Sequence, residues 1–493
     1  MGARLETSNL ELLDASRVQT TQAEWALARG GSARSLVIAP RPGAESVFAE
    51  FEGERSGGVL VGPLSPRNAA ALRARLEWLR PRPLGTQTSA GLGDRLGLAT
   101  PGHVRAVRRV GGGIAPVFPQ QSIREMARTG RTPIEVMDDA TWGMFGEGWK
   151  GGTGADADHL KTVEDVDATL AAGFTLFTID PSAHVDSAAD TDALATLRAK
   201  AAALPWAALD DSEASLRRRY AGRTLAVEHL QVAFDEPVTL RAAAKYGKAI
   251  AHVAAMSRHL LKAAGTRPVE LEVSVDETDT PTTPAEHCFV AGELRRLGVA
   301  WVSLAPRFVG RFEKGVDYIG DLAALEADVA AHAAIARHFG PYKLSLHSGS
   351  DKFSVYPIAA RLARGLVHLK TAGTSYLEAL RTIAALDPAL FRDVYAFARE
   401  RYEADRATYH VSAELSQAPA AGEVTEAGLP GLLEHFHARE ILHVTFGSVL
   451  RQAGPDGAPR FEDRLLALLR GNPEAYADNL ERHFVRHLEP FAG

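Results

Sequence analysis

The stretch KLSLHSGSDK, residues 343–352, contains the end of a predicted strand and the start of a polar loop. Residues 343–346 alternate polar and apolar side chains, as a half-buried strand does. The chain then continues with His347, Ser348, Ser350, Asp351 and Lys352. The strands of an α/β barrel all end at one rim, where substrates bind. We therefore predict a barrel strand over 343–346 and functional side chains directly after it.

Short apolar or β-branched runs predict eight strands, at 115–118, 133–137, 174–179, 271–275, 300–304, 343–346, 366–369 and 441–445. Ala- and Leu-rich stretches of helical period lie between several of them, for example over 321–339. Repeated strand–helix units build a parallel sheet, and eight of them close into a barrel. The predicted fold is an α/β fold, a TIM-type (β/α)8 barrel, although a chain of 493 residues also has room for two or three domains.

The spacing of these strands predicts additional segments around the barrel. The intervals 180–270 and 370–440 are too long for a single crossover helix, which predicts helical insertions at about 185–265 and 385–440. Residues 1–90 contain strand-like pieces, SLVIAP (35–40) and GVLVGP (58–63), followed by Pro-rich turns. We expect 1–90 to form an N-terminal extension or cap and 91–493 to form the barrel with its insertions.

Composition excludes several functional classes. The 55 basic and 61 acidic residues give a net charge of −6, which offers no patch for nucleic-acid phosphates. Cys288 is the only cysteine, so neither an intrachain disulfide nor a CxxC zinc site can form. The first residues lack the pattern of a targeting segment, and no long apolar run predicts a membrane span. We expect a soluble cytoplasmic protein with a small-molecule partner rather than nucleic acid or a membrane.

Polar side chains follow most of the predicted strands, where the rim of the barrel would lie. They are Asp180 and His184 after the third strand, Asp276 and Glu277 after the fourth, Arg307 after the fifth, the 347–352 group after the sixth, Lys370 and Thr371 after the seventh, and His443 in the eighth. His347 has two interpretations: a metal ligand or acid–base group, or a histidine bonded to a neighbouring loop. The histidine and carboxylate side chains at these strand ends together favour a metal site.

The carboxylates after the third and fourth strands have alternative roles. Asp180 and His184, four residues apart, share a helix face if the turn between them is helical, or else Asp180 caps that turn. Asp276 and Glu277 are adjacent, so their side chains point to opposite faces of the strand and only one faces the barrel axis.

The basic residues and the last histidine also have alternative roles. Arg307 and Lys352 suit the binding of a carboxylate or phosphate, or they lie at the surface. Lys370 binds a carboxylate, stabilises an oxyanion, forms a Schiff base or is solvated. His443 points into the barrel or belongs to the core.

Two Gly-rich stretches resemble nucleotide motifs only weakly. GLGDRLGLATPGH (91–103) has the glycines of a dinucleotide fingerprint but no strong strand before it, so a loop in which Asp94 and Arg95 pair or touch substrate is the alternative. WGMFGEGWKGGTGADADH (142–159) lacks the Gly-Lys-Ser/Thr ending of a phosphate-binding loop. For 142–159 we expect a mobile lid over the site, with a plain linker as the alternative.

Several strings in one order resemble the tagaturonate epimerase family over about residues 90–470. They are GLGDRLGLATPGH, FTIDPSAHVD, VDETDTPTTPAEH, KLSLHSGSDKFSVYP, VHLKTAGTSYLEALR and LHVTFGSVL. The resemblance implies conversion of D-tagaturonate to D-fructuronate with a divalent metal ion, either Zn, Mn, Ni or Co. Some members of the family also interconvert tagatose and fructose at C4, so the substrate is a hexuronate or a ketohexose.

The resemblance also implies roles for individual residues. Asp180 would be the proton acceptor and Glu277 the proton donor, and His184, His347 and His443 would hold the metal. Substrate contacts would come from Arg95, Arg307, Ser348, Ser350, Asp351, Lys352, Lys370 and Thr371.

The reaction limits the mechanism, because a hydrogen on the carbon β to a ketone is not acidic. Retro-aldol cleavage and re-addition is the favoured route, with direct proton transfer as the alternative, while oxidation by a bound nicotinamide requires a dinucleotide site that the sequence does not indicate. A metal-dependent ketose isomerase or aldolase on the same barrel is a second interpretation, and a non-catalytic sugar-binding protein is a third.

Overall fold

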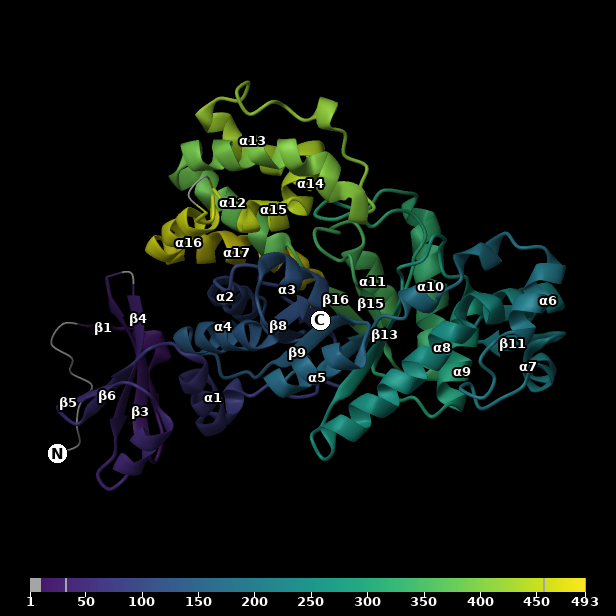
Figure 1. Ribbon diagram of the computed structural model, residues 1–493, viewed down its shortest axis with the longest axis horizontal. Coiled ribbons are helices and arrows are strands. Elements are labelled where there is room, and N and C mark those ends of the chain that lie inside the picture. The colour runs from purple at the N-terminus through teal and green to yellow at the C-terminus, as the bar shows by residue number, and fades with distance from the viewer. Residues whose placement is uncertain (1–9, 32, 455–456, 493) are drawn as a thin grey trace.

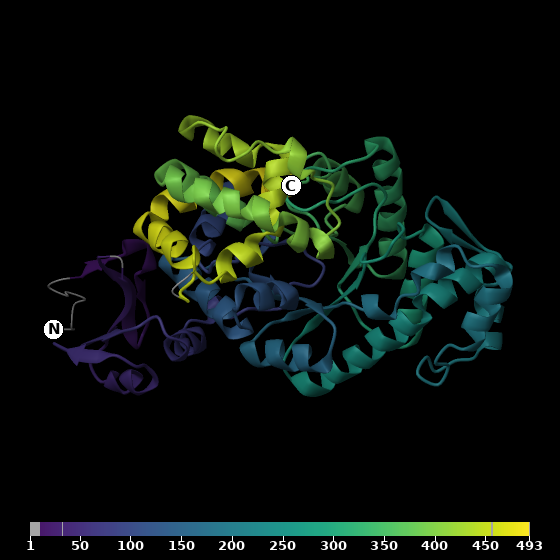
Figure 2. The ribbon, with the colours of Figure 1, turned by 45° about the horizontal axis from the view of Figure 1, so that its top comes forward.

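The structure is a computed structural model that describes residues 10–31, 33–454 and 457–492. An antiparallel sheet lies at one end of an elongated molecule, the barrel lies in the centre, and an insertion lies at the other end (Figure 1). Helices from the C-terminal part form a layer beside the barrel in both views (Figures 1 and 2). The expected lack of a targeting segment falls partly on residues 1–9, which lie outside the described residues.

Eight parallel strands form a closed barrel, which confirms the predicted TIM-type fold. In barrel order the strands are β10 (Leu176–Ile179), β13 (Glu270–Val275), β14 (Ser303–Pro306), β15 (Lys343–Leu346), β16 (Val367–Lys370), β7 (Ser89–Gly91), β8 (Ala115–Ser122) and β9 (Gly154–Leu160). The strand predicted at 343–346 has the bounds of β15. Neighbouring strands pair in parallel, so all their C-terminal ends meet at one rim.

Two of the predicted strands are wrong, because residues 133–137 and most of 441–445 are helical. Helix α4 (Pro133–Gly146) begins with a capping box, in which Thr132 and Glu135 each bond the backbone N–H of the other. Helix α14 (Phe436–Val444) includes most of the second run. Short apolar runs occur both in buried helices and in strands, so their composition alone does not distinguish the two.

The strands that complete the barrel lie at the two Gly-rich stretches: β7 ends at Gly91, where the first stretch begins, so a short strand does precede it, and most of β9 lies at the end of the second. The lid predicted at 142–159 is wrong, because this stretch contains the end of α4, a short connection and most of β9. In the other stretch, the Asp94 carboxylate accepts hydrogen bonds from the backbone N–H groups of Leu96, Gly97 and Ala99. This compact turn leads from β7 into helix α2 (Thr100–Val110).

The N-terminal region forms an antiparallel sheet of its own. Its strands are β1 (Glu11–Leu12), β2 (Val18–Gln19), β3 (Ala23–Gly30), β4 (Ala33–Pro40), β5 (Glu54–Ser56) and β6 (Val59–Gly62). Helix α1 (Pro66–Arg75) follows the sheet, and Arg73 forms an ion pair of 2.6 Å with Asp138 of α4. Both side chains are largely buried, so this ion pair fixes α1 against the barrel helices.

A long insertion separates β10 from β13. It contains the 3-10 turn η4 (Ser182–His184), helices α6 (Leu194–Ala202) and α7 (Glu213–Tyr220), the hairpin β11 (Arg223–Val227) and β12 (Leu230–Phe234), and helix α8 (Glu236–Ala264). Helix α8 returns along the barrel and packs against α5 (Val163–Ala172) and α9 (Pro284–Arg296).

The C-terminal helices follow β16 and contact the barrel rim. They are α12 (Thr374–Leu386), α13 (Pro388–Asp405), α14, α15 (Phe446–Arg451), α16 (Glu462–Gly471) and α17 (Pro473–Leu488). Arg439 of α14 donates to the Gly315 carbonyl in the loop after β14, and His487 of α17 accepts from the Asp351 N–H in the loop after β15. The helical layer therefore holds two of the loops that form the rim.

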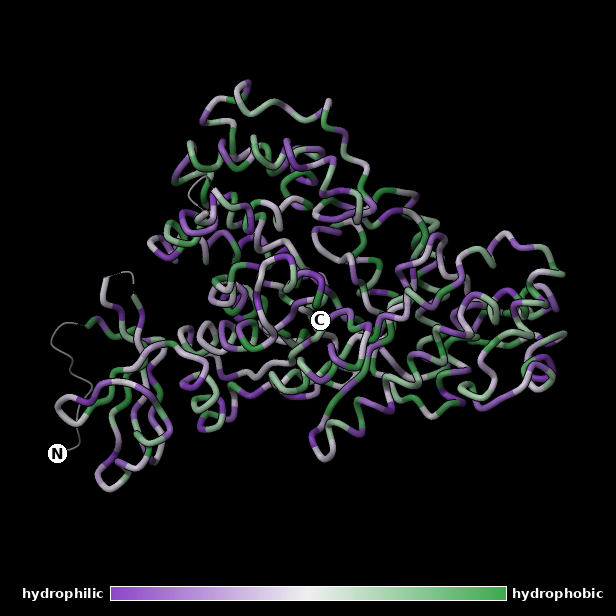
Figure 3. The backbone as a smooth tube through the Cα atoms, in the orientation of Figure 1, coloured by the Kyte–Doolittle hydropathy of each residue, from purple (hydrophilic) through white to green (hydrophobic). Residues whose placement is uncertain are grey.

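Hydropathy changes repeatedly along the backbone, with short hydrophobic stretches separated by hydrophilic ones (Figure 3). Within the described residues, no helix combines the length and the apolar composition that crossing a membrane requires.

Helices α2 and α17 pack closely at Gly102. A Cβ atom at this position would overlap the Leu480 side chain and approach the Ala477 carbonyl oxygen to 2.9 Å. Helix α17 also holds the loop after β15. The close packing of α2 and α17 therefore helps to fix the position of this loop at the rim.

We predict that Gly102→Ala lowers the free energy of unfolding by about 1–3 kcal/mol, because overpacking separates the two helices. Urea denaturation measures this change. Gly112→Ala is the matched control, since a Cβ atom there meets no atom within 4 Å. Equal stability of the two variants would contradict the proposed close packing.

Candidate active site

An ammonium group lies inside the barrel, bonded to side chains from three other strands. Lys370 Nζ of β16 is 3.0 Å from Asp156 Oδ2, 2.6 Å from Asp158 Oδ1, 2.7 Å from Glu272 Oε1 and 2.8 Å from Thr178 Oγ1. Burial lowers the pKa of Lys370, but the three carboxylates outweigh it and hold this pKa above its usual value. The group is therefore a permanent cation, which does not suit the amine nucleophile of a Schiff base.

Glu272 connects this cation to His347 at the rim. Its Oε1 accepts a hydrogen bond from His347 Nε2 at 2.6 Å. The other ring nitrogen, Nδ1, lies 3.2 Å from Asp276 Oδ1 but has no hydrogen-bond partner among the described residues. Burial lowers the pKa of His347, yet Asp276 and Glu272 together raise it to about 10. A carboxylate that accepts from one ring nitrogen and so orients the other is the arrangement found behind histidine ligands of metals.

His159, at the C-terminal end of β9, lies next to His347. The two ring centroids are 4.9 Å apart, and His159 Nδ1 is 3.1 Å from Asp180 Oδ2. The backbone of His159 has φ of +91°, which side-chain-bearing residues rarely adopt. Burial lowers the pKa of His159, but Asp158 and Asp180 raise it above its usual value.

These side chains form two clusters of metal-ligating groups. Asp158, His159 and His347 place one ligand atom each within 4.8 Å of one another, and so do His159, Asp180 and Glu277. The two clusters share His159 and lie at the ends of β9, β10, β13 and β15.

The two predicted catalytic carboxyl groups lie on the same side of the rim. Asp180 is buried, which raises its pKa, but His159 and the Ser182 N–H at 2.9 Å outweigh burial and hold the pKa well below its usual value. Glu277 is partly exposed and pairs with Arg124 at 3.0 Å. Lys161 Nζ lies between them, 3.3 Å from Asp180 and 3.8 Å from Glu277.

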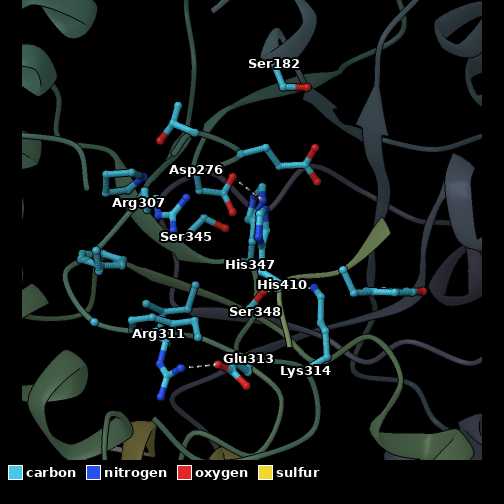
Figure 4. A pocket seen from close by; sticks show the side chains of 18 of the residues that line it. Ser182, Asp276, Arg307, Arg311, Glu313, Lys314, Ser345, His347, Ser348 and His410 are labelled. Atoms are coloured by element: carbon cyan, nitrogen blue, oxygen red, sulfur yellow. Dashed lines mark hydrogen bonds and ion pairs between the residues drawn. The ribbon is translucent and has the colours of Figure 1, made fainter. Parts of the chain in front are cut away.

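A pocket of about 540 Å³ opens over these groups. Its walls come from the strand ends, the loop after β14 and the segment containing Tyr409 and His410. His347 lies centrally in the pocket, with Arg307 to one side and Lys314 to the other (Figure 4). This volume and the mixture of cations, carboxylates and hydroxyls suit a small polar molecule such as a sugar acid.

Among the predicted site residues, Glu277, Arg307, His347 and Ser348 line the pocket, and Asp180 lies beside His159 at its edge. The structure places three others in the anchor of the loop after β15. Asp351 pairs with Arg439 at 3.0 Å and with His483 at 2.6 Å, and Ser350 Oγ donates to a backbone carbonyl. These contacts hold the loop against the C-terminal helices.

Lys352 has the same anchoring position. Its buried Nζ donates to the backbone carbonyls of Glu313, Val316 and Ser350. Burial lowers the pKa of Lys352 to about 7, but three carbonyl acceptors match the three hydrogens of an ammonium group. We therefore assign the charged form to Lys352.

The remaining predicted residues also lie apart from the pocket wall. His184 is exposed on η4 and stacks on His252 at 4.2 Å. His443 lies buried in α14 instead of on a strand, and burial together with Arg95 lowers its pKa well below the usual value. Arg95 pairs with Glu125 at 2.6 Å. Thr371 Oγ1 donates to the Gly91 carbonyl, next to the pairing of β16 with β7. Within the described residues, neither His184 nor His443 belongs to a ligand cluster.

Sequence reasoning missed several residues of this site, among them Asp158, His159, Lys161, Arg124 and Lys314. The signal for His159 was present, because DADH (156–159) has the same character as the polar ends of the other strands. It stood inside the stretch that we interpreted as a lid. Lys314 lies in the middle of a loop, far from any strand end in sequence, and no pattern marked it.

Two buried carboxyl groups meet at the outer side of the loop after β14. Glu440 accepts from the Ala413 N–H at 2.9 Å and lies within electrostatic range of the carboxyl group of Glu313. Glu313 in turn accepts from the N–H and hydroxyl groups of Ser412. Burial and the charge of Glu313 raise the pKa of Glu440 to about 8. Burial and the nearby charge of Glu313 therefore favour the neutral form of Glu440 at pH 7.

Comparisons with known proteins give consistent similarities. A sequence model of the tagaturonate epimerase family matches residues 14–491. A tagaturonate/fructuronate epimerase from Thermotoga maritima is 43% identical over 485 residues, which cover 98% of this chain and 97% of that protein. The native crystal structure of a fructuronate–tagaturonate epimerase from Cohnella laeviribosi superposes with a TM-score of 0.93 at 37% identity, covering 99% of this chain and 98% of that one. A glycerol complex of that enzyme gives a TM-score of 0.92.

We predict that Lys370→Met lowers the free energy of unfolding by about 3–5 kcal/mol, because three buried carboxylates lose their counter-ion. Urea denaturation of the purified variant measures the loss. Lys262→Met, at an exposed position of α8, is the control and should stay within about 0.5 kcal/mol of the parent. A fully stable Lys370→Met variant would show that these carboxyl groups are not charged.

A second prediction concerns the pH dependence of stability at Glu440. Between its usual pKa of 4.5 and about 8, the folded state holds a proton that the unfolded state releases. Rising pH in this window therefore destabilises the fold, by up to about 1.4 kcal/mol per pH unit. Glu440→Gln lacks this titration, so its stability relative to the parent should increase from pH 5 to pH 8.

Thermal or urea unfolding at several pH values measures this difference. The exposed Glu426→Gln variant should follow the parent at every pH. Parallel curves for Glu440→Gln and the parent would mean that Glu440 is ionised in the folded protein.

Proposed function

Because the chain belongs to the tagaturonate epimerase family, we propose that it interconverts D-tagaturonate and D-fructuronate in the pocket at the C-terminal rim of its barrel. The observation that carries this proposal is the convergence of Asp180 and Glu277 on His159, beside His347. His159, His347 and Glu277 line the pocket of about 540 Å³, and Asp180 lies at its edge beside His159. The single free cysteine, Cys288, is compatible with a cytoplasmic location, which we include in the proposal.

The donor atoms of the rim fit a divalent metal ion. His347 has a carboxylate behind its Nε2, its Nδ1 forms no hydrogen bond among the described residues, and the ligand atoms of Asp158, His159 and His347 lie within 4.8 Å of one another. Nitrogen and oxygen ligands of this kind suit Zn, Mn, Ni or Co. We propose His347, His159 and Asp158 as the ligands, in place of the set with His184 and His443. A bound ion would supply positive charge next to the sugar oxygens that become negative during the reaction.

The protein side chains suit cleavage and re-formation of a carbon–carbon bond. Asp180 is ionised at neutral pH and takes the proton of the C4 hydroxyl as the C3–C4 bond breaks. The electron pair of that bond stays on the C1–C3 fragment, and C4 becomes an aldehyde carbon. After this aldehyde has rotated, the bond re-forms on its other face and Glu277 returns a proton to the C4 oxygen.

The low pKa of Asp180 favours this route over direct removal of the hydrogen on C4. A carboxylate whose pKa lies well below its usual value is a weak base. It can accept an acidified hydroxyl proton, whereas a C–H group without an adjacent carbonyl requires a far stronger base. Lys161 lies close to both carboxyl groups and holds them in position while one gains a proton and the other loses one.

Arg307 and Ser348 line the pocket and provide contacts for the oxygen atoms of the substrate. Neutral ketohexoses have the same carbon chain and the same reacting hydroxyl group, so we include tagatose and fructose as weaker substrates at C4. Their lower affinity would follow from the missing carboxylate.

NMR analysis of the products tests the function. The enzyme is incubated with tagaturonate, fructuronate, tagatose or fructose, with and without a chelator. We expect the C4 epimer of each uronate and loss of turnover with the chelator. An aldose product would identify an isomerase, and free three-carbon products would identify an aldolase. Binding without any product would indicate a sugar-binding protein.

We predict that His347→Ala removes bound metal and epimerase activity together, because it deletes the ligand that Glu272 orients. Metal content is measured on the purified variant, and activity is measured by NMR. His338→Ala, at an exposed position of α10 (Leu322–Phe339), is the control and should keep both. Metal content that stays at the parent level in His347→Ala would refute the ligand assignment.

The two ligand sets are separated by a second pair of variants. Our assignment expects His159→Ala to lose metal and His184→Ala to retain it. The reverse result would favour the set with His184.

A further inference from the structure

Four cations line the pocket, namely Arg124, Arg307, Arg311 and Lys314, and among the described residues only Arg124 and Arg311 have a carboxylate partner. Arg124 pairs with Glu277 at 3.0 Å, and the exposed Arg311 lies 3.4 Å from Glu313. The ammonium group of Lys314 has a different environment. Its hydrogen bond goes to the Ser348 hydroxyl at 3.0 Å, and among the described residues no carboxylate oxygen lies within 4.0 Å of it. Lys314 is therefore a pocket cation with an open position for an anion.

Lys314 is half-buried in the pocket wall, which makes this open position costly in the free enzyme. Burial lowers the pKa of Lys314, and the nearby charge of Arg124 lowers it further. An ammonium group that has left bulk water without a counter-ion raises the free energy of the folded state. An anion that enters the pocket and contacts Lys314 relieves this cost, so the binding of an anion is favoured over the binding of a neutral molecule of the same shape.

The backbone around Lys314 is held rigidly. Lys352 donates to the carbonyls of Glu313 and Val316 on either side, and Arg439 donates to the carbonyl of Gly315. These bonds fix the loop before substrate arrives, so little conformational entropy is lost when Lys314 engages a ligand. The buried lysine at 352 thus positions the pocket lysine at 314.

The location of Lys314 also fits the length of the substrate. In a hexuronate, the carboxylate carbon is two bonds from C4, the carbon that is inverted. Its receptor must therefore lie near the catalytic groups without neutralising them. Lys314 lies within electrostatic range of Asp276 and Glu277 but outside ion-pair distance of both, and its partner Ser348 directly follows His347.

We propose that Lys314, together with the Ser348 hydroxyl, receives the C6 carboxylate of the substrate and gives the enzyme its preference for uronates over neutral ketohexoses. This assignment rests on the proposed epimerase function. Lys314 is a specificity-determining residue in this role, distinct from the carboxyl groups that move protons.

The test compares two compounds that differ only at C6. Fructuronate is measured as substrate, and fructose is measured as a competitive inhibitor of fructuronate conversion, so the fructose measurement does not depend on its turnover. In Lys314→Met we expect the KM for fructuronate to rise about 30- to 100-fold, the loss of one charge-assisted contact, while the inhibition constant of fructose changes less than about threefold. Lys314→Arg should recover part of the affinity for fructuronate.

Arg311→Met is the matched control, because it removes the same charge from an already paired position of the pocket wall. We expect its KM for fructuronate to stay within about threefold of the parent. Unchanged metal content, and a melting temperature that does not fall below that of the parent, show in all three variants that the site is intact.

Two outcomes would overturn the assignment. One is an equal loss of affinity for fructuronate and fructose in Lys314→Met, which would indicate a general disturbance of the pocket. The other is an equal loss in Arg311→Met, which would indicate the overall field of the pocket instead of a contact. If the parent enzyme fails to convert either uronate, the proposed epimerase function fails first, and the two failures are thus distinguishable.

Discussion

The site depends on the ion pairs that the ammonium group of Lys370 forms inside the barrel. Three carboxylates from two other strands converge on it, and such a concentration of buried negative charge would be unstable without a cation at its centre. Glu272 links this cluster to the rim, because the oxygen that contacts Lys370 also accepts a hydrogen bond from His347. Asp158, held by Lys370, likewise lies 3.6 Å from the Nε2 of its neighbour His159. The chemistry at the rim therefore rests on a polar core within the barrel.

This polar core explains which strands the sequence could predict. Six of the eight barrel strands are apolar or alternating runs, and β15 has its predicted bounds. The strand β9 was missed because its inward positions hold Asp156 and Asp158, which serve Lys370 and break the hydrophobic pattern. The strand β7 is too short to form a pattern at all. In the opposite sense, apolar runs at 133–137 and 441–445 belong to helices buried against the barrel, where composition alone does not reveal the period.

The expectation that polar residues directly after barrel strands form the site was correct for some residues and wrong for others. It brought Asp180, Glu277 and His347 to attention because each directly follows a strand. The same expectation singled out Asp351 and Lys352, yet their charges are satisfied by His483, Arg439 and backbone carbonyls from distant segments. Conversely, Lys314 reaches the pocket from within a loop. Which charges have partners is set by tertiary contacts, and a single sequence contains no local record of them.

The grip of α17 on the loop after β15 has a consequence for the order of events during biosynthesis. Asp351 is held by His483 and His487, which lie more than a hundred positions later in the chain. A ribosome delivers the barrel strands long before it delivers this helix. The barrel can therefore close before the segment after His347 is held in place. The rim is complete only after α17 has docked. Assembly of the barrel and completion of its rim are therefore separate steps.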